Sequence, residues 1–170
     1  MNTKPLLPLL LVAAFASAEE IPNRLIDYGK FETQVMRVGE LRSGHRVSEQ
    51  QFIRMARVSG TVILDARSAE KFSLLHVKGA KNLSLPDITA DELAKVIPSK
   101  DTRVLIYCNN NFLNQPQAFP SKLPSASLNI HTINVLFAYG YTNVYELGPL
   151  IDINKARLEF AGSLSAGNGV

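Results

Sequence analysis

The pattern of apolar and polar positions predicts a domain in which strands and helices alternate. Short apolar runs rich in β-branched and aromatic residues, typical of buried strands, occupy residues 61–64, 104–107 and 143–147. Apolar positions at helical spacing occupy residues 48–57, 68–74, 89–96 and 127–139. This order predicts an α/β fold, a central parallel sheet with helices on both faces.

Local signals indicate where three of the helices begin or end. Ser48 precedes Gln51 and Thr89 precedes Glu92 by three positions, which is the spacing of a capping box at a helix start. Gly140 stands where the last helix should end, because a glycine readily adopts the left-handed conformation of that position. The signals therefore support a helical interpretation of these segments.

The two ends of the chain carry weaker patterns. Residues 19–47 are mixed and polar and are expected to form an N-terminal extension, in which the alternation over 31–38 predicts a strand. The domain itself is expected over residues 48–153. Residues 154–170 are expected to be partly disordered, because the end of the chain from Gly162 is rich in glycine and serine.

The first eighteen residues have the layout of a secretory signal peptide. Lys4 supplies the positive start, residues 6–15 are apolar apart from Pro8, and Ala-Ser-Ala at 16–18 is a small-residue cleavage site. The apolar run is too short to span a bilayer as a stable helix. We therefore expect cleavage after Ala18 and a periplasmic or secreted protein, with no membrane association after cleavage.

Composition and charge exclude several classes of function. With 18 Lys plus Arg against 15 Asp plus Glu, the net charge of +3 is small and spread along the chain, so nucleic-acid binding is not expected. One cysteine and three scattered histidines lack the spacing of a zinc site, so no metal is expected. No sequence feature indicates a cofactor.

The single cysteine, Cys108, directly follows the predicted strand 104–107. Exported proteins tend to pair their cysteines or avoid them, so an unpaired one is informative. One interpretation is a small buried apolar side chain. The other is a reactive thiol, and the position favours it because ligands of parallel sheets lie beyond the carboxyl ends of the strands.

Several motifs together resemble the rhodanese domain. One predicted strand ends in Asp-x-Arg at Asp65 and Arg67, and the motif His-x-x-Gly-Ala-x-Asn follows with His76 and Gly79. A later strand runs into Cys108, which matches the place of the family's active-site cysteine. The resemblance covers roughly residues 48–153 and implies the rhodanese-like α/β fold.

The resemblance also implies a chemistry and roles for these residues. A rhodanese thiolate attacks the outer sulfur of a donor such as thiosulfate and becomes a persulfide, from which a thiol or cyanide removes the sulfur. Cys108 would be this nucleophile. Asp65 and Arg67 point the same way at a strand end and are candidates to brace adjacent loops, with an exposed ion pair as the alternative. His76 is expected to be structural and without a catalytic role.

The segment after Cys108 departs from the family pattern. The family's six-residue loop would close at Leu113, without the usual arginine or lysine, and the next predicted helix begins only near Ser127. Residues 109–126 are therefore an insertion by that standard. Candidate substrate-binding residues in this segment are Asn109, Asn110, Asn111, Phe112 and Lys122.

Each of these candidates also has an ordinary structural interpretation. The three asparagines could form a neutral anion-binding turn, because asparagine tolerates left-handed backbone angles and donates hydrogen bonds, or they could form a simple polar loop. Phe112 and Phe119 could cover the thiol or anchor the loop in the core. Lys122 is the one cation that could replace the missing arginine, and it could equally be solvated.

Two hypotheses of function follow. The first is an exported sulfurtransferase or sulfur carrier that forms a persulfide on Cys108 and acts with a small sulfur-containing anion or a thiol acceptor. The second is a non-catalytic rhodanese-fold module for binding or redox sensing, in which Cys108 packs in the core. In a variant of the second, Cys108 forms a mixed disulfide with another exported protein.

Overall fold

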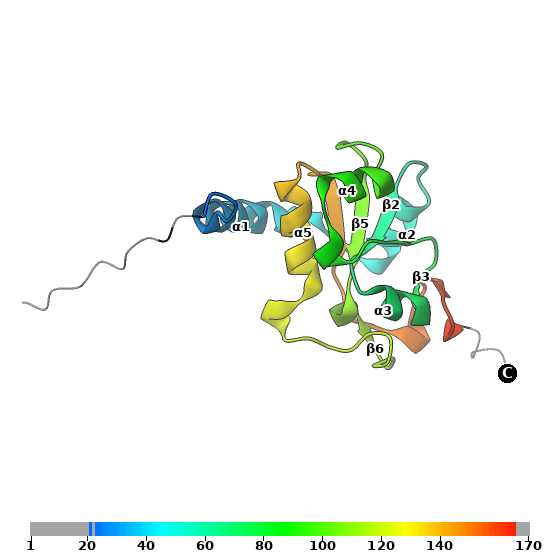
Figure 1. Ribbon diagram of the computed structural model, residues 1–170. Coiled ribbons are helices and arrows are strands. Elements are labelled where there is room, and N and C mark those ends of the chain that lie inside the picture. The colour runs from blue at the N-terminus through cyan, green and yellow to red at the C-terminus, as the bar shows by residue number, and fades with distance from the viewer. Residues whose placement is uncertain (1–20, 22, 166–170) are drawn as a thin grey trace, which may run out of the picture.

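The computed structural model describes residue 21 and residues 23–165, so the predicted signal peptide at 1–18 lies outside the described residues. A five-stranded parallel sheet forms the centre of the domain, with the strand order β1-β7-β5-β2-β4 (Figure 1). Its strands are β1 (Arg46–Val47), β2 (Val62–Asp65), β4 (Lys81–Asn82), β5 (Val104–Tyr107) and β7 (Val144–Leu147). The α/β fold predicted from the sequence is confirmed.

Helices cover both faces of this sheet. The helices are α1 (Tyr28–Arg42), α2 (Glu49–Ala56), α3 (Ala69–Leu74), α4 (Ala90–Val96) and α5 (Leu128–Ala138). One apolar core joins the sheet to α1, α4 and α5, and a second joins its other face to α2 and the C-terminal part of the chain. Every residue of β2 and β5 is buried, which explains the apolar runs 62–64 and 104–107.

Short elements connect and extend this framework. Two small sheets pair β3 (His76–Val77) with β9 (Phe160–Ala161) and β6 (Phe112–Leu113) with β8 (Ile151–Asp152). Short 3₁₀ turns are η1 (Ser43–His45), η2 (Leu85–Asp87), η3 (Asn109–Asn111), η4 (Pro124–Ala126) and η5 (Ile153–Lys155). No helix among residues 23–165 is long and apolar enough to cross a membrane.

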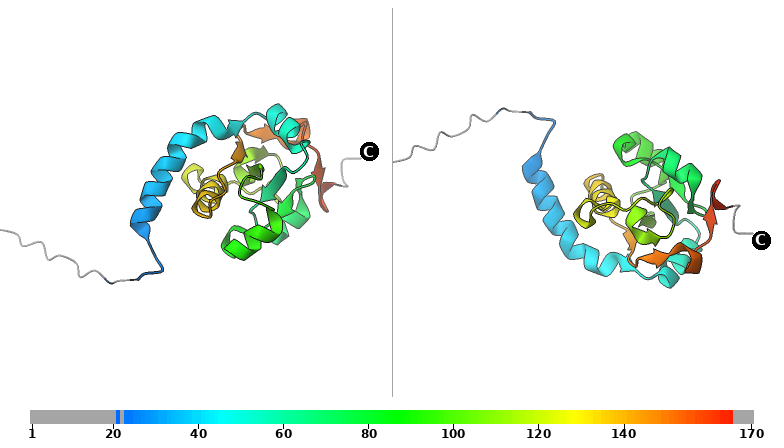
Figure 2. Two further views of the ribbon diagram at one scale, coloured as in Figure 1. Left: turned by 90° about the horizontal axis from the view of Figure 1, so that it is seen from above. Right: turned by 90° about the horizontal axis from the view of Figure 1, so that it is seen from below.

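The strand predicted over residues 31–38 is wrong, because this segment lies within α1. Asp27 caps the helix by accepting a hydrogen bond from the Lys30 N–H at 2.8 Å. Val38 is buried in the core beneath the helix. Figure 2 shows α1 running along the outside of α5, which it contacts. Alternation over so short a stretch did not distinguish a strand from one face of a helix.

Residues 162–165, the described end of the C-terminal segment, pair with α3. Residues 162–165 were expected to fray, but the Ser163 and Leu164 N–H groups donate to the carbonyls of Ser73 and Leu74 at 3.0 and 2.9 Å. Backbone pairing of this kind does not depend on side-chain composition, so a Gly- and Ser-rich sequence does not reveal it. The central sheet begins at Arg46, slightly before the predicted domain start.

Candidate functional site around Cys108

Cys108 follows the carboxyl end of the central strand β5 and is 1% exposed. Its Sγ lies 3.4 Å from Oγ of Ser127, the residue that caps the N-terminus of α5. The insertion therefore begins directly after Cys108, and the helix that follows it begins next to the sulfur. A helix N-terminus favours negative charge, so this placement suits a thiolate or a persulfide anion.

The backbone amides of the turn after Cys108 are used within the turn itself. The Asn111 N–H donates to the Cys108 carbonyl at 3.2 Å, and the Phe112 N–H donates to the Asn109 carbonyl. The Cys108 N–H donates to Asn111 Oδ1 at 2.9 Å. These donors hold the 3₁₀ turn η3 together, and in its capping box the Asn111 N–H also pairs with the Cys108 side chain.

Asn110 joins the start of the insertion to Lys122, near its end. Its Nδ2 donates to the Lys122 carbonyl at 2.8 Å, and its Oδ1 accepts from the Lys122 N–H at 3.1 Å. Lys122 thus joins this contact through its backbone, while its side chain is exposed. Two of the candidate binding residues are therefore brought together as a clasp of the loop.

Asn111 and Asn109 are buried and hold neighbouring segments. Asn111 Nδ2 donates to the Leu147 carbonyl at 2.7 Å, and its Oδ1 also accepts from Asn129 Nδ2 at 3.1 Å. Asn109 Nδ2 donates to the Pro120 carbonyl at 2.8 Å. Among the described residues, Oδ1 of Asn109 and Oδ1 of Asn129 are buried without a hydrogen-bond partner.

Phe112 belongs to an aromatic cluster in the core. Its ring centroid lies 4.6 Å from that of Phe119, 5.3 Å from that of Phe160 and 5.9 Å from that of Tyr107. Phe112 and Phe119 are both buried. The structure therefore shows both phenylalanines anchoring the insertion, the second of the two roles that the sequence left open.

Asp65 and Arg67 form a buried ion pair that braces three segments. The Arg67 Nε donates to Asp65 Oδ1 at 2.9 Å. Its two terminal nitrogens also donate to the carbonyls of Ala118, within the insertion, and Leu75, each at 2.8 Å. The pair is not on the surface, because the residues are 0% and 3% exposed.

Tyr107 completes this network and was not singled out from the sequence. Its hydroxyl donates to Asp65 Oδ2 and accepts from the Val77 N–H at 3.1 Å. Burial, and next the charge of Asp65, raise the pKa of the Tyr107 phenol well above its ordinary value. The sequence signal for this contact was a tyrosine at the end of an otherwise aliphatic strand. A buried hydroxyl needs a hydrogen-bond partner, so this tyrosine indicated a buried polar contact.

His76 and Gly79 shape the chain next to this network. The His76 ring stacks on Phe72 at 3.8 Å between centroids, and its Nδ1 lies 2.7 Å from the Phe72 carbonyl oxygen. Gly79 has φ of +85°, a conformation that favours glycine. The structure places both residues in the turn around β3, separate from Cys108.

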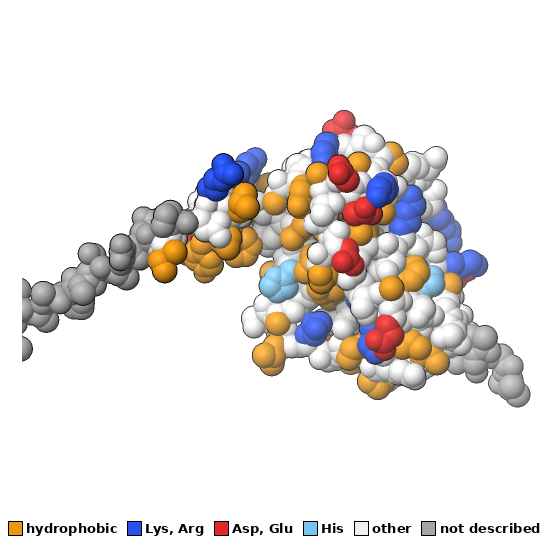
Figure 3. Space-filling view, in the orientation of Figure 1, with side chains coloured by type: hydrophobic (Ala, Val, Ile, Leu, Met, Phe, Trp, Pro, Cys, Tyr) orange, Lys and Arg blue, Asp and Glu red, His pale blue; other side chains and the backbone are white. Residues whose placement is uncertain are grey.

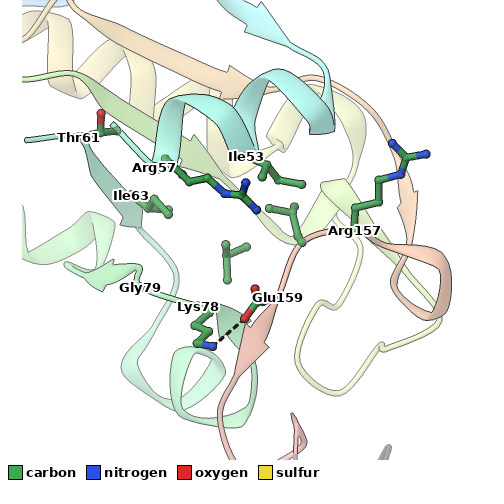
Figure 4. Close-up of a pocket in the computed structure, with 11 residues that line it drawn as sticks. Ile53, Arg57, Thr61, Ile63, Lys78, Gly79, Arg157 and Glu159 are labelled. Carbon is green, nitrogen blue, oxygen red and sulfur yellow. Dashed lines mark hydrogen bonds and ion pairs between the residues drawn. The ribbon is translucent and has the colours of Figure 1, made fainter. Parts of the chain in front are cut away.

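A hollow of about 330 Å³ opens beside β2 (Figure 4). It is lined by the charged side chains of Arg57, Lys78 and Glu159, among others, and Lys78 Nζ lies 2.7 Å from Glu159 Oε2. Cys108 is not among its lining residues.

Figure 3 shows acidic and basic side chains intermixed on the face that it presents. Within the described part of the chain, no three His, Cys, Asp or Glu side chains are grouped as metal ligands would be.

Comparison with known proteins identifies the family. Residues 48–148, more than half of the chain, match the rhodanese-like domain, and the chain belongs to this family. None of the curated proteins matches the sequence significantly.

Solved structures of low sequence identity share the fold. The BH2092 protein from Bacillus halodurans is 19% identical with a TM-score of 0.50, over 82% of this chain and 90% of that one. The rhodanese-like domain of an Anabaena sp. protein is 15% identical with a TM-score of 0.52, over 74% of this chain and 85% of that one. At these identities the likeness concerns the fold alone.

Proposed function

We propose that this rhodanese-like protein is an exported sulfurtransferase or sulfur carrier that holds the transferred sulfur as a persulfide on Cys108. The observation that supports the proposal is the position of the only thiol, at the carboxyl end of the central strand and against the N-cap of α5. The signal-peptide pattern at residues 1–18 supports the location outside the cytoplasm.

The proposed reaction has two steps. The Cys108 thiolate attacks the sulfane sulfur of a donor, the donor's bond to that sulfur breaks, and Cys108 becomes a persulfide. A thiol acceptor then attacks the outer sulfur, the bond between that sulfur and Cys108 breaks, and the acceptor leaves as its own persulfide while Cys108 is restored. The N-terminus of α5 stabilises the anion in each step, by about 0.3–1 kcal/mol if exposed and up to about 2 kcal/mol if partly buried. The Ser127 hydroxyl can donate a hydrogen bond to the same sulfur.

Turnover in this proposal requires the insertion to open, because Cys108 is buried. The segment 121–126 is exposed along its whole length. The clasp between Asn110 and Lys122 consists of two hydrogen bonds near the surface. Breaking these bonds would free the exposed segment while the aromatic anchors Phe112 and Phe119 stay in place.

The burial of Cys108 also favours a second candidate function. With Cys108 1% exposed and the Phe112 amide bonded to the Asn109 carbonyl, the domain could act without thiol chemistry, as a binding or redox-sensing module. In that case Cys108 packs as a small apolar side chain. The two candidates differ in whether the thiol accepts sulfur.

Intact-mass measurement distinguishes the two candidates. The reduced wild-type chain and Cys108→Ser are incubated with thiosulfate and, separately, with the hydropersulfide of a small thiol, and excess reagent is removed before measurement. The proposal expects the wild-type chain to gain one sulfur atom from at least one donor and Cys108→Ser to gain none. A wild-type chain that gains no sulfur from either donor, while still folded by circular dichroism, supports the non-catalytic module.

A further inference from the structure

The hollow beside β2 is formed by segments that lie far apart in the sequence. Its lining residues come from the segment 53–63, which contains the end of α2 and the start of β2, from residues 77–79 and from residues 157–159. Residues 157–159 follow the region 48–148 that matches the rhodanese-like domain. One wall of the hollow therefore lies outside the family match, and membership of the family does not account for it.

Hydrogen bonds fix this wall to the rest of the domain. The N–H groups of Arg157 and Leu158 both donate to Glu49 Oε1, at 2.6 and 3.1 Å, which joins the wall to the first turn of α2. The Lys78 N–H donates to the Glu159 carbonyl at 2.8 Å, next to the pairing of β3 with β9. The hollow is therefore preformed, and a ligand would not have to order its walls.

The inner surface of the hollow is apolar. Ile63, Val77 and Leu158 are buried, and Ile53 packs against the same core. Ligand-binding clefts typically have volumes of about 300–1,000 Å³ and combine an apolar lining with a few polar groups. At about 330 Å³ the hollow is at the small end of this range, which suits a small ligand with an apolar body.

The charged side chains around the hollow leave an excess of positive charge. Lys78 is balanced by Glu159, with 2.7 Å between Nζ and Oε2. Arg57 and Arg157 also line the hollow, and neither forms an ion pair with another described residue. The hollow therefore attracts an anion.

Arg57 is the cation that faces the apolar surface. Figure 4 shows its side chain reaching into the space between Ile53 and Ile63, whereas Arg157 extends away from the hollow. The pKa of Glu159 is lowered, chiefly by Lys78 and to a smaller extent by the charge of Arg57, so that charge is felt on the opposite wall. A guanidinium presents a planar fork of donors that matches the two oxygens of a carboxylate.

We propose that this hollow binds a small carboxylate with an apolar body, such as an arylalkanoate or a branched-chain carboxylate. The body lies against Ile63, Val77 and Leu158, and Arg57 binds the carboxylate. A monoanion fits better than a dianion because the charge of Lys78 is already balanced, and an inorganic anion such as phosphate would leave the apolar surface uncovered. The site is separate from Cys108 and does not depend on sulfur transfer.

Titration of the folded, full-length chain with 3-phenylpropanoate and with 4-methylpentanoate, followed by backbone amide shifts in NMR spectra, tests the proposal. We expect saturable binding of at least one of them with a dissociation constant below about 1 mM, and the largest shifts at Thr61, Gly79 and Leu158. The uncharged amide of the ligand that binds should bind at least about tenfold more weakly. Phosphate and acetate should give no saturable shifts.

Two matched variants test the role of Arg57. Arg57→Met should weaken binding of the carboxylate by about tenfold, the effect of losing a charged hydrogen-bonding partner. Arg54→Met is the control, because Arg54 is an exposed arginine of α2 that does not line the hollow. It should leave the dissociation constant unchanged. Equal dissociation constants for the two variants would overturn the role of Arg57.

The remaining outcomes test the ligand class and the location of the site. Saturable binding of neither carboxylate, or equal binding of the amide, overturns the proposal, as do saturable shifts confined to residues away from the hollow. Cys108→Ser should bind as tightly as the wild type, and weaker binding would overturn a site separate from the thiol. A chain that binds the carboxylate but accepts no sulfur contradicts the proposed function and leaves this inference standing.

Discussion

Replacement of Arg67 by methionine tests whether the buried ion pair holds the site together. Methionine has a similar length but no charge, so Arg67→Met leaves the Asp65 carboxylate buried without its counter-ion. It also removes the hydrogen bonds to the carbonyls of Ala118 and Leu75. Asp65 would keep the Tyr107 hydroxyl and the residue 67 N–H as its remaining donors.

The expected loss is large because both partners are buried. Removing one member of a buried ion pair typically costs about 3–5 kcal/mol, whereas an exposed pair contributes about 0–1 kcal/mol. The whole free energy of unfolding of a natural domain is about 5–15 kcal/mol. Arg67→Met should therefore remove a substantial part of the stability and loosen the insertion at Ala118.

Urea unfolding followed by circular dichroism measures this loss. Arg67→Met, Asp65→Asn and the double variant form a cycle, and we expect the double variant to be less destabilised than the sum of the two single variants. Arg67→Lys keeps the charge but loses the fork geometry, so its free energy of unfolding should lie between those of the wild type and Arg67→Met. It provides the measurement if Arg67→Met does not fold. A loss below about 1 kcal/mol for Arg67→Met would refute the reasoning, since that value belongs to an exposed pair.

Three further substitutions test other contacts. Asn110→Ala removes both hydrogen bonds to Lys122, so a maleimide should label Cys108 several-fold faster without a matching loss of global stability. An unchanged labelling rate would contradict the role of these bonds in closing the loop. Glu146→Gln, at a buried carboxylate held by two arginines, should cost about 1–3 kcal/mol in urea unfolding, and an unchanged midpoint contradicts this. Gly162→Ala would place a Cβ 2.6 Å from a carbonyl oxygen of α3 at φ of +124°, so proteolysis of the C-terminal segment should accelerate. Gly39→Ala, whose Cβ meets no atom within 4 Å, is its control and should not accelerate it.

The sequence predicted those parts of the fold that local patterns encode. The capping boxes at Ser48 and Thr89 mark helix starts in the sequence, and Ser48 forms its box in the structure. The buried runs that became β2 and β5 stood out because both faces of those strands are covered. Strands of two residues, such as β1 and β4, are too short to carry a period and were not predicted.

The candidate site could be predicted only in part, because most of its contacts depend on tertiary structure. The position of Cys108 after a buried strand could be predicted, because parallel strands place their carboxyl ends at one edge of the sheet. The approach of Ser127 to the sulfur could not, since it results from how the insertion packs around Phe112 and Phe119. Asn109 and Asn111 likewise donate to backbone carbonyls that folding brings near, which no sequence spacing encodes.

Peptide mapping after exposure to a sulfur donor tests the central claim most directly. The folded wild-type chain is incubated with a hydropersulfide, separated from it, alkylated and digested, and the peptide containing Cys108 is analysed by mass spectrometry before and after addition of an acceptor thiol. The account predicts one extra sulfur atom on Cys108 that disappears when the acceptor is added. A Cys108 peptide that carries no extra sulfur, or sulfur that no thiol removes, would contradict a role of this residue in sulfur transfer.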